Sequence, residues 1–142
     1  MKIIVGTIIK EDNKILMVKE SKKECYGLWN FPSGRLEQNE DVLSGAIRET
    51  LEETGHKVVL TRMLPIQIIQ NDDEVIQRFM FMASIVEKNA QTIMGDEIME
   101  TRFVSLEEIK NNTIKLREPM ENLRLLQAAE KDIAITLDKA FM

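Results

Sequence analysis

Hydrophobic and polar residues alternate along this chain in a way that predicts several β-strands. The segments 2–10 and 14–19 are rich in β-branched and other apolar residues, and the polar stretch 11–13 between them predicts a hairpin. Two longer strand-like segments follow at 57–70 and 74–87, and the first contains a proline, which cannot donate to a central ladder. We therefore expect these segments to form a sheet in which the third strand is broken or bulged.

Helical periodicity replaces strand periodicity between the second and third of these segments. Apolar and small residues recur there at helical spacing, so one side of the helix can pack against a sheet. Asn39 or Asp41 can cap the start of this helix, and Gly55 fits the left-handed position just past its end. The residues on the packing side are Leu43, Ala46, Ile47, Thr50, Leu51 and Thr54.

The last third of the chain predicts one more strand and two helices. A short strand within 95–104 leads to a capping box, formed by Ser105 and Glu108, that opens a short helix. Pro119 starts a longer amphipathic helix, and the tail 133–142 is too short to assign. These elements indicate an α/β fold with a mixed sheet and helices on both of its sides. The apolar positions of the last helix are Met120, Leu123, Leu126 and Ala129.

The first helix has a second, acidic side. Glu49, Glu52 and Glu53 are spaced i, i+3 and i+4, which places them on one face of the helix. Like charges at this spacing repel, and Arg48 is the only basic residue in the last two turns. Divalent cations would remove the repulsion. Because the donors are oxygens and the chain has no His or Cys cluster, Mg²⁺ or Mn²⁺ is favoured over zinc.

Length, charge and cysteine content narrow the class of protein. The 142 residues allow one hydrophobic core, so we expect a single domain over residues 1–142. The net charge of −5 argues against a nucleic acid polymer as partner. No apolar run reaches membrane-spanning length. With one cysteine and no signal peptide before the first strand-like segment, we expect a cytoplasmic protein that does not bind membranes.

The spacing of the charged residues around the first helix matches a known motif. The stretch 34–56 fits Gly-x5-Glu-x7-Arg-Glu-U-x-Glu-Glu-x-Gly-U, where U is a bulky aliphatic residue, except that Thr50 and His56 occupy the U positions. This stretch resembles the Nudix box. The resemblance implies an α/β/α sandwich and a hydrolase that uses divalent metal to cleave a diphosphate linked to another group. The matching residues are Gly34, Glu40, Arg48, Glu49, Glu52, Glu53 and Gly55.

The resemblance also implies roles within the helix. Glu49, Glu52 and Glu53 match the metal-binding carboxylates and form the catalytic set together with Arg48. Glu49 is our candidate for activating the attacking water, directly or as a metal ligand. Arg48 would orient Glu52 or Glu49 through a charge-assisted hydrogen bond.

Residues beside the helix are expected to complete this site. Pro32 and Gly34 would make the turn that leads into the box, and Gly34 and Glu40 would support the metal ligands from behind. Ser33 directly precedes the box, where members of the family often supply a main-chain carbonyl to the metal. An acidic residue from a later loop often joins the cluster. Here that residue is Glu97, with Glu100 as the alternative.

Three residues outside the box are candidates for binding the substrate. Arg78 is a lone basic residue in an otherwise apolar strand and needs an anionic partner, either a box glutamate or a substrate phosphate. Trp29 could stack on a ring of the substrate or pack in the core. Lys22 could reach a phosphate, although the charged segment 19–24 is also typical of a solvated loop.

We therefore expect a Mg²⁺- or Mn²⁺-dependent hydrolase of a nucleoside di- or triphosphate or a related small phosphorylated molecule, acting as a monomer or homodimer. The segments 29–37, 78–83 and 115–119 are similar to Nudix phosphatases that act on nucleotides and thiamine-pathway diphosphates, including the thiamine-pyrimidine diphosphate. The alternatives are a pyrophosphatase for ADP-ribose or an oxidised nucleotide, and a ligand-binding module without catalysis. The intact acidic face of the helix argues against the binding module.

Overall fold

The computed structural model describes residues 1–70, 72–93, 95–131 and 135–136. Strands dominate this part of the chain, and three α-helices and one short 3₁₀ helix connect or flank them. In chain order the elements are β1 (Lys2–Glu11), β2 (Lys14–Glu20), the 3₁₀ helix η1 (Lys23–Cys25), β3 (Trp29–Asn30), β4 (Ser33–Arg35), α1 (Val42–Thr54), β5 (Lys57–Met63), β6 (Gln67–Gln70), β7 (Val75–Glu87), β8 (Ile98–Ser105), α2 (Leu106–Lys110), α3 (Pro119–Glu130) and β9 (Ile135–Thr136).

The strands form one mixed sheet whose main path runs β3-β2-β1-β7-β5-β9. Three further strands lie off this path, with β4 pairing with β1, β6 with β7 and β8 with β2. The central pair β1 and β7 is parallel, and the other pairs are antiparallel. The predicted mixed sheet is confirmed.

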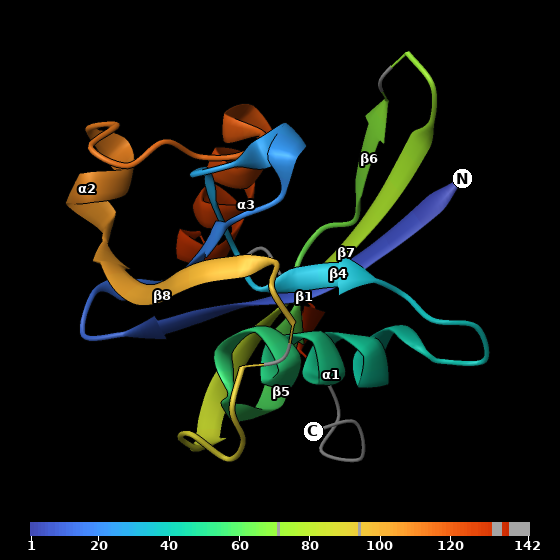
Figure 1. Cartoon of the computed structure of the whole chain (residues 1–142), viewed down its shortest axis with the longest axis horizontal. Coiled ribbons are helices and arrows are strands. Elements are labelled where there is room, and N and C mark those ends of the chain that lie inside the picture. Colours follow the sequence, from blue (N-terminus) through green and yellow to red (C-terminus); the bar gives the residue numbers. More distant parts are fainter. Residues whose placement is uncertain (71, 94, 132–134, 137–142) are drawn as a thin grey trace.

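Alternation along β7 places a hydrophobic core on each face of the sheet. Met80 belongs to a core with Leu125 and Leu126 of α3, whereas Phe81 belongs to a second core with Ala46 of α1. In Figure 1, α1 correspondingly lies on the opposite side of β1 from α2 and α3. The fold is therefore the α/β/α sandwich that the resemblance implied.

The predicted hairpin and the predicted break in the third strand are both confirmed. Asp12 and Asn13 make the turn between β1 and β2 with φ angles of 51° and 62°, the left-handed region that tight hairpins require. Pro65 lies between β5 and β6, each of which pairs separately with β7. The segment 57–70 therefore forms two strands, β5 and β6, in place of one.

The caps of α1 hold its two ends as local sequence predicts. Asp41, and not Asn39, is the N-cap, and its carboxylate accepts a hydrogen bond of 2.8 Å from the backbone N–H of Ser44. Gly55 follows the helix with φ of 77° and donates its N–H to the carbonyl of Leu51. The predicted capping box of the short helix α2 is also present.

Two expectations about the segments before α1 are wrong. Gly34 does not lie in a turn but in β4, where it pairs with Val5 of β1. The segment 19–24 is not a solvated loop throughout, because β2 continues to Glu20, which is only 6% exposed. Gly34 and residues 19–20 therefore belong to the sheet, whereas residues 21–24 lie outside the strand, and 22–24 are exposed as predicted.

The buried side of α3 also differs from the prediction. Met120 is 61% exposed and Leu123 lies at the surface, whereas Asn122 and Leu125 are buried. Of the tail 133–142, only β9 at 135–136 is described, and the other residues lie outside the described part of the chain. No helix among the described residues is long and apolar enough to cross a membrane.

Candidate active site

A cavity of about 320 Å³ opens beside α1, where β1, β4 and β7 meet the segment that leads into α3. Its wall on the α1 side carries Ser33, Gly34, Glu49 and Glu53. The floor of the cavity is formed by Glu20, Asn30, Arg78 and Arg117, which lie far apart in the sequence. The basic residues of the lining are Lys2, Lys22, Arg35, Arg78 and Arg117, and the other acidic ones are Glu20, Glu97 and Glu118.

Gly34 lets α1 approach β4 closely. A Cβ atom at this position would collide with both carboxylate oxygens of Glu49. Only a glycine leaves room for the Glu49 side chain between the strand and the helix. The glycine is therefore explained by close packing of a carboxylate, and its backbone needs no unusual φ.

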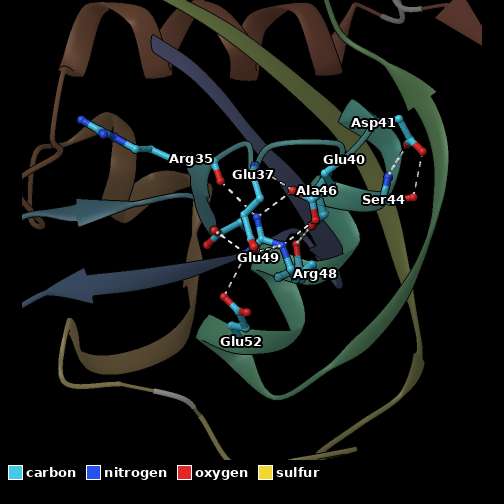
Figure 2. Close-up of polar contacts among 10 residues, drawn as sticks. Arg35, Glu37, Glu40, Asp41, Ser44, Ala46, Arg48, Glu49 and Glu52 are labelled. Carbon is cyan, nitrogen blue, oxygen red and sulfur yellow. Dashed lines mark hydrogen bonds and ion pairs between the residues drawn. The ribbon is translucent and has the colours of Figure 1, made fainter.

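Arg48 lies at the centre of the carboxylates of the box (Figure 2). Its Nε and Nη2 donate to the two oxygens of Glu40 at 2.6 and 2.9 Å, and Nη2 also donates to the carbonyl of Arg35. Its Nη1 donates to Glu49 Oε1 at 2.8 Å and to Glu52 Oε2 at 3.1 Å. Both carboxylates named as possible partners of Arg48 thus accept from a single nitrogen, so they converge on one point.

Glu53 is held by the strand that precedes the helix. Its Oε1 accepts a 2.9 Å hydrogen bond from the backbone N–H of Ser33. Burial raises the pKa of the Glu53 carboxyl well above its ordinary value, and this hydrogen bond opposes the rise. Burial also raises the pKa of Glu49, with Arg48 opposing, whereas the hydrogen bonds from Arg48 lower the pKa of Glu40. Burial therefore destabilises the anionic forms of Glu49 and Glu53, the two box carboxylates that line the cavity.

The ligand atoms that this site offers are carboxylate oxygens, which hard cations such as Mg²⁺ prefer. Glu49 and Glu53 line the cavity, each has one oxygen in a hydrogen bond, and the second oxygen accepts none within the described part of the chain. Glu52 is not part of the lining. It accepts a hydrogen bond from the same Arg48 nitrogen as Glu49, so the positive charge of Arg48 lies between these two carboxylates. No group of three or more His, Cys, Asp or Glu side chains is gathered at metal-binding distance among the residues described. A metal therefore requires small side-chain rotations.

The predicted ligands outside the helix differ in position. Ser33 lines the cavity and its backbone N–H donates to Glu53, and the role of its carbonyl toward a metal stays a prediction. Glu97 also lines it, and its carboxylate pairs with Lys22 Nζ at 3.4 Å. Glu100 instead pairs with Arg102 at the surface and is not part of the lining. Of the two acidic candidates, Glu97 is the one that the fold brings to the site.

The candidates for substrate binding separate in the same way. Lys22 and Arg78 line the cavity, whereas Trp29 is 5% exposed, packs in the core and has the guanidinium of Arg102 4.9 Å from its ring centre. The prediction that Trp29 stacks on the substrate is therefore not supported. The pairing of Arg78 with a box glutamate is wrong, because its partners are the neutral amides of Asn30, Asn122 and Gln67.

Several residues of the cavity could not be recognised from sequence patterns. Glu20 and Arg117 are 97 positions apart and form a two-oxygen ion pair at 2.9 and 3.1 Å. Asn30 and Asn122 join α3 to β3 through a hydrogen bond of 3.1 Å. A buried amide looks like any surface amide in a sequence, so no spacing rule could have identified these residues. The segments 29–37 and 115–119, which contain Asn30 and Arg117, stood out only through their similarity to Nudix phosphatases.

Comparison with known proteins agrees with this geometry. Residues 2–124 match the family model described as NUDIX domain. The chain is 30% identical over 132 residues to the phosphatase NudJ of Escherichia coli O1:K1 / APEC, which covers 91% of this chain and 85% of that protein. It is 37% identical over 81 residues to the zebrafish (Danio rerio) 8-oxo-dGDP phosphatase NUDT18, covering 56% of this chain and 24% of that protein.

A solved structure shares the fold of this chain. A NUDIX hydrolase from Nitrosomonas europaea superimposes with a TM-score of 0.88 at 24% identity, covering 96% of this chain and 93% of that one. The chain spans only about a quarter of the length of the first curated relatives, 28% of a Caenorhabditis elegans protein and 24% of the zebrafish one. The family model nevertheless covers most of the chain and includes the whole box. The chain belongs to the Nudix family of hydrolases.

Proposed function

We propose that this protein is a Mg²⁺- or Mn²⁺-dependent hydrolase that removes phosphate from a nucleoside di- or triphosphate or from a related diphosphate such as the thiamine-pyrimidine diphosphate. The observation that carries the proposal is that Glu49 and Glu53 face a cavity whose opposite side carries buried positive charge. The named phosphatases among the relatives support release of single phosphate, since NudJ is matched over 85% of its length.

The residues of the box supply the means to hold a metal. Glu49, Glu52 and Glu53 would hold it, with the main chain of Ser33 and the carboxylate of Glu97 beside them. When bound, the metal supplies positive charge for the phosphate oxygens and lowers the pKa of water near it. Phosphoryl transfer needs mainly positioning and electrostatics from a protein, and a capped helix packed on a sheet provides both.

In this proposal Arg48 orients Glu49, and Glu49 accepts the proton. Arg48 holds Glu49 Oε1, so the carboxylate cannot rotate freely. Its other oxygen, Oε2, accepts no hydrogen bond among the described residues and would take the proton from the attacking water. Glu40 fixes Arg48 through two hydrogen bonds and thereby keeps this orientation.

The test is hydrolysis of a panel of compounds with Mg²⁺ or with chelator, with released phosphate measured separately from pyrophosphate. The panel contains nucleoside di- and triphosphates, thiamine diphosphate, its pyrimidine precursor diphosphate, ADP-ribose and an oxidised guanine triphosphate. We expect metal-dependent release of single phosphate. Pyrophosphate from triphosphates, or AMP from ADP-ribose, would instead identify a pyrophosphatase.

Variants connect this activity to the site. Glu49→Gln, Glu52→Gln and Glu53→Gln should each lower turnover by about 100-fold or more, because each removes a charge that faces the metal. Glu100→Gln is the matched control, since Glu100 is an exposed glutamate outside the cavity and should leave turnover unchanged. Near-normal activity of all three box variants at saturating Mg²⁺ would overturn the assignment.

A further inference from the structure

Arg78 is a buried cation whose partners carry no charge. It is 4% exposed, yet it lines the cavity. Its Nη1 donates to Asn122 Oδ1 at 2.6 Å and to Gln67 Oε1 at 3.5 Å, and its Nη2 donates to Asn30 Oδ1 at 3.1 Å. Amide oxygens orient a guanidinium but do not neutralise it, so the positive charge remains uncompensated at contact distance.

Three other basic residues of the lining, Lys2, Lys22 and Arg117, have carboxylate partners, and Arg35 is exposed and not buried. Lys22 pairs with Glu97 at 3.4 Å, and Arg117 pairs with Glu20 at 2.9 Å. Within the described residues, no carboxylate lies within 4.0 Å of the Arg78 guanidinium. Burial lowers the pKa of Arg78 to about 10, with distant carboxylates opposing, so the side chain is still charged at neutral pH.

Two asparagines fix the orientation of this guanidinium. Asn30 Oδ1 accepts hydrogen bonds from Arg78, from Asn122 Nδ2 and from the backbone N–H of Phe31. Asn122 is fully buried and also donates to the carbonyl of Arg117 at 2.7 Å. Asn30 Oδ1 thus accepts three hydrogen bonds and Asn122 Oδ1 accepts one from Arg78, so the asparagines hold Arg78 in place before any ligand binds.

The surroundings of Arg78 lie apart from the acidic wall. Cross-strand register places Arg78 of β7 opposite Ile4 of β1 and Gln67 of β6. Ile69 and Ile76, also in the lining, pair two positions along the same strands β6 and β7. The guanidinium therefore stands beside an apolar wall made by three strands, and the box carboxylates stand on α1.

We propose that Arg78, held in place by Asn30 and Asn122, forms a binding subsite for one phosphate group of the substrate. This phosphate is a different one from the phosphate that is hydrolysed beside Glu49 and Glu53. A guanidinium with unused N–H donors suits a phosphate in both charge and geometry. This proposal rests on the proposed function, since it places a second phosphate of the same substrate. Asn122 is a positioning residue that couples α3 to the subsite.

The subsite can be tested without metal, and therefore independently of catalysis. Inorganic phosphate is titrated into the protein in the presence of chelator, at constant ionic strength, and binding is followed by calorimetry and by the rise in melting temperature. We expect saturable binding to the unmodified protein. Arg78→Met should weaken it by about ten-fold or more, because a charge-assisted hydrogen bond is lost. Absence of saturable binding to the unmodified protein, or equal binding by Arg78→Met, would overturn the proposal.

Variants of Gln67 test the subsite while Arg78 stays in place, so they do not depend on Arg78→Met being folded. Gln67 is not part of the lining, and its amide contacts Arg78 on one side and the carbonyl of Glu121 on the other. Gln67→Glu places a carboxylate beside Arg78 that competes with the ligand, whereas Gln67→Met removes the same amide without adding charge. We expect Gln67→Glu to weaken phosphate binding about ten-fold and Gln67→Met to change it less than about two-fold. Equal effects of the two variants would contradict a charge-based subsite.

Kinetics with the best compound of the panel separate this subsite from the metal site. Gln67→Glu should raise KM by about ten-fold with kcat largely retained, because the carboxylates of the box are untouched. If the panel reveals no hydrolysis at all, the phosphate titration still decides the subsite. If hydrolysis is present and Gln67→Glu leaves KM unchanged, the proposed function stands and the subsite is wrong.

Discussion

Glu53 experiences two opposing influences in the folded protein. Its carboxyl is buried, which raises its pKa well above the ordinary value, and it accepts a hydrogen bond from Ser33, which favours the charged form. Burial is the stronger of the two. Without metal, folding therefore favours the protonated form of Glu53.

This balance predicts how stability depends on pH. Because the folded pKa of Glu53 lies above its unfolded value near 4.5, its contribution is fully present below that pH and is lost as the pH rises through the folded pKa. In chelator, Glu53→Gln should leave stability at low pH nearly unchanged and raise the melting temperature at neutral pH, on the order of 3 °C. Glutamine can still accept from Ser33.

Melting curves of both proteins from pH 4 to pH 8 would show this difference, because the effects of other carboxylates cancel in the comparison. A gap between the two proteins that stays constant across the range would contradict a raised pKa for Glu53.

Spacing predicts the residues of the site that share one element, whereas Ser33 and Glu97 followed from the family resemblance and Arg78 from its isolation in an apolar strand. Helical spacing alone placed Glu49, Glu52 and Glu53 on one face, since three or four residues make one turn. Glu20 and Arg117 could not be found in this way, because tertiary folding joins them across 97 positions. For Trp29 the sequence left open stacking on the substrate or packing in the core, and the structure places it in the core.

At the scale of elements, the end of α1 is joined to the turn that follows β7. Gly55 adopts φ of 77°, and its carbonyl accepts hydrogen bonds from the N–H groups of Ala90 and Gln91. A Cβ atom on Gly55 would lie 2.5 Å from the carbonyl oxygen of Gln91. The glycine is thus required both for its backbone angle and for the space beside it.

This double requirement can be separated with a matched pair of variants. Gly55→Ala should lower the free energy of unfolding by roughly 2–3 kcal/mol, from the left-handed strain and the clash together. Gly27 has φ of 78°, and a methyl group added there would meet nothing within 4 Å, so Gly27→Ala should cost only about 1 kcal/mol. Urea unfolding measures both. Equal losses would show that the clash with Gln91 relaxes freely.

Most elements followed from local patterns, and the exceptions have a common cause. The hairpin, the break at Pro65 and both helix caps depend on residues close in sequence, so they were predictable. The exposed side of α3 was not, because Asn122 is buried by its hydrogen bonds to Arg78 and Asn30. Hydrophobic periodicity treats a buried polar residue as a surface residue and rotates the predicted face accordingly.

At the scale of the whole molecule, metal binding should act on the stability of the fold. Strands and α1 together present the carboxylates, so a cation that binds only the folded chain stabilises it in proportion to its saturation. With Mg²⁺ or Mn²⁺ at about 100 times its dissociation constant, the gain is about 2.7 kcal/mol. The melting temperature of the unmodified protein should therefore rise by several degrees.

Thermal melting with chelator and then with excess Mg²⁺ measures this gain. Glu49→Gln and Glu53→Gln should show a much smaller rise, and Glu100→Gln should show the full rise. The same rise in all variants would place the metal elsewhere on the protein.

The box and the floor of the cavity are built from separate parts of the chain. The box occupies 34–56, whereas the floor uses residues 20, 30, 78 and 117. Sequence changes in the floor can therefore alter which molecule is selected while the hydrolytic helix stays intact. We expect that re-engineering of the substrate range can begin on β7 and in the segment before α3, because changes there leave α1, Ser33 and Glu97 unaltered.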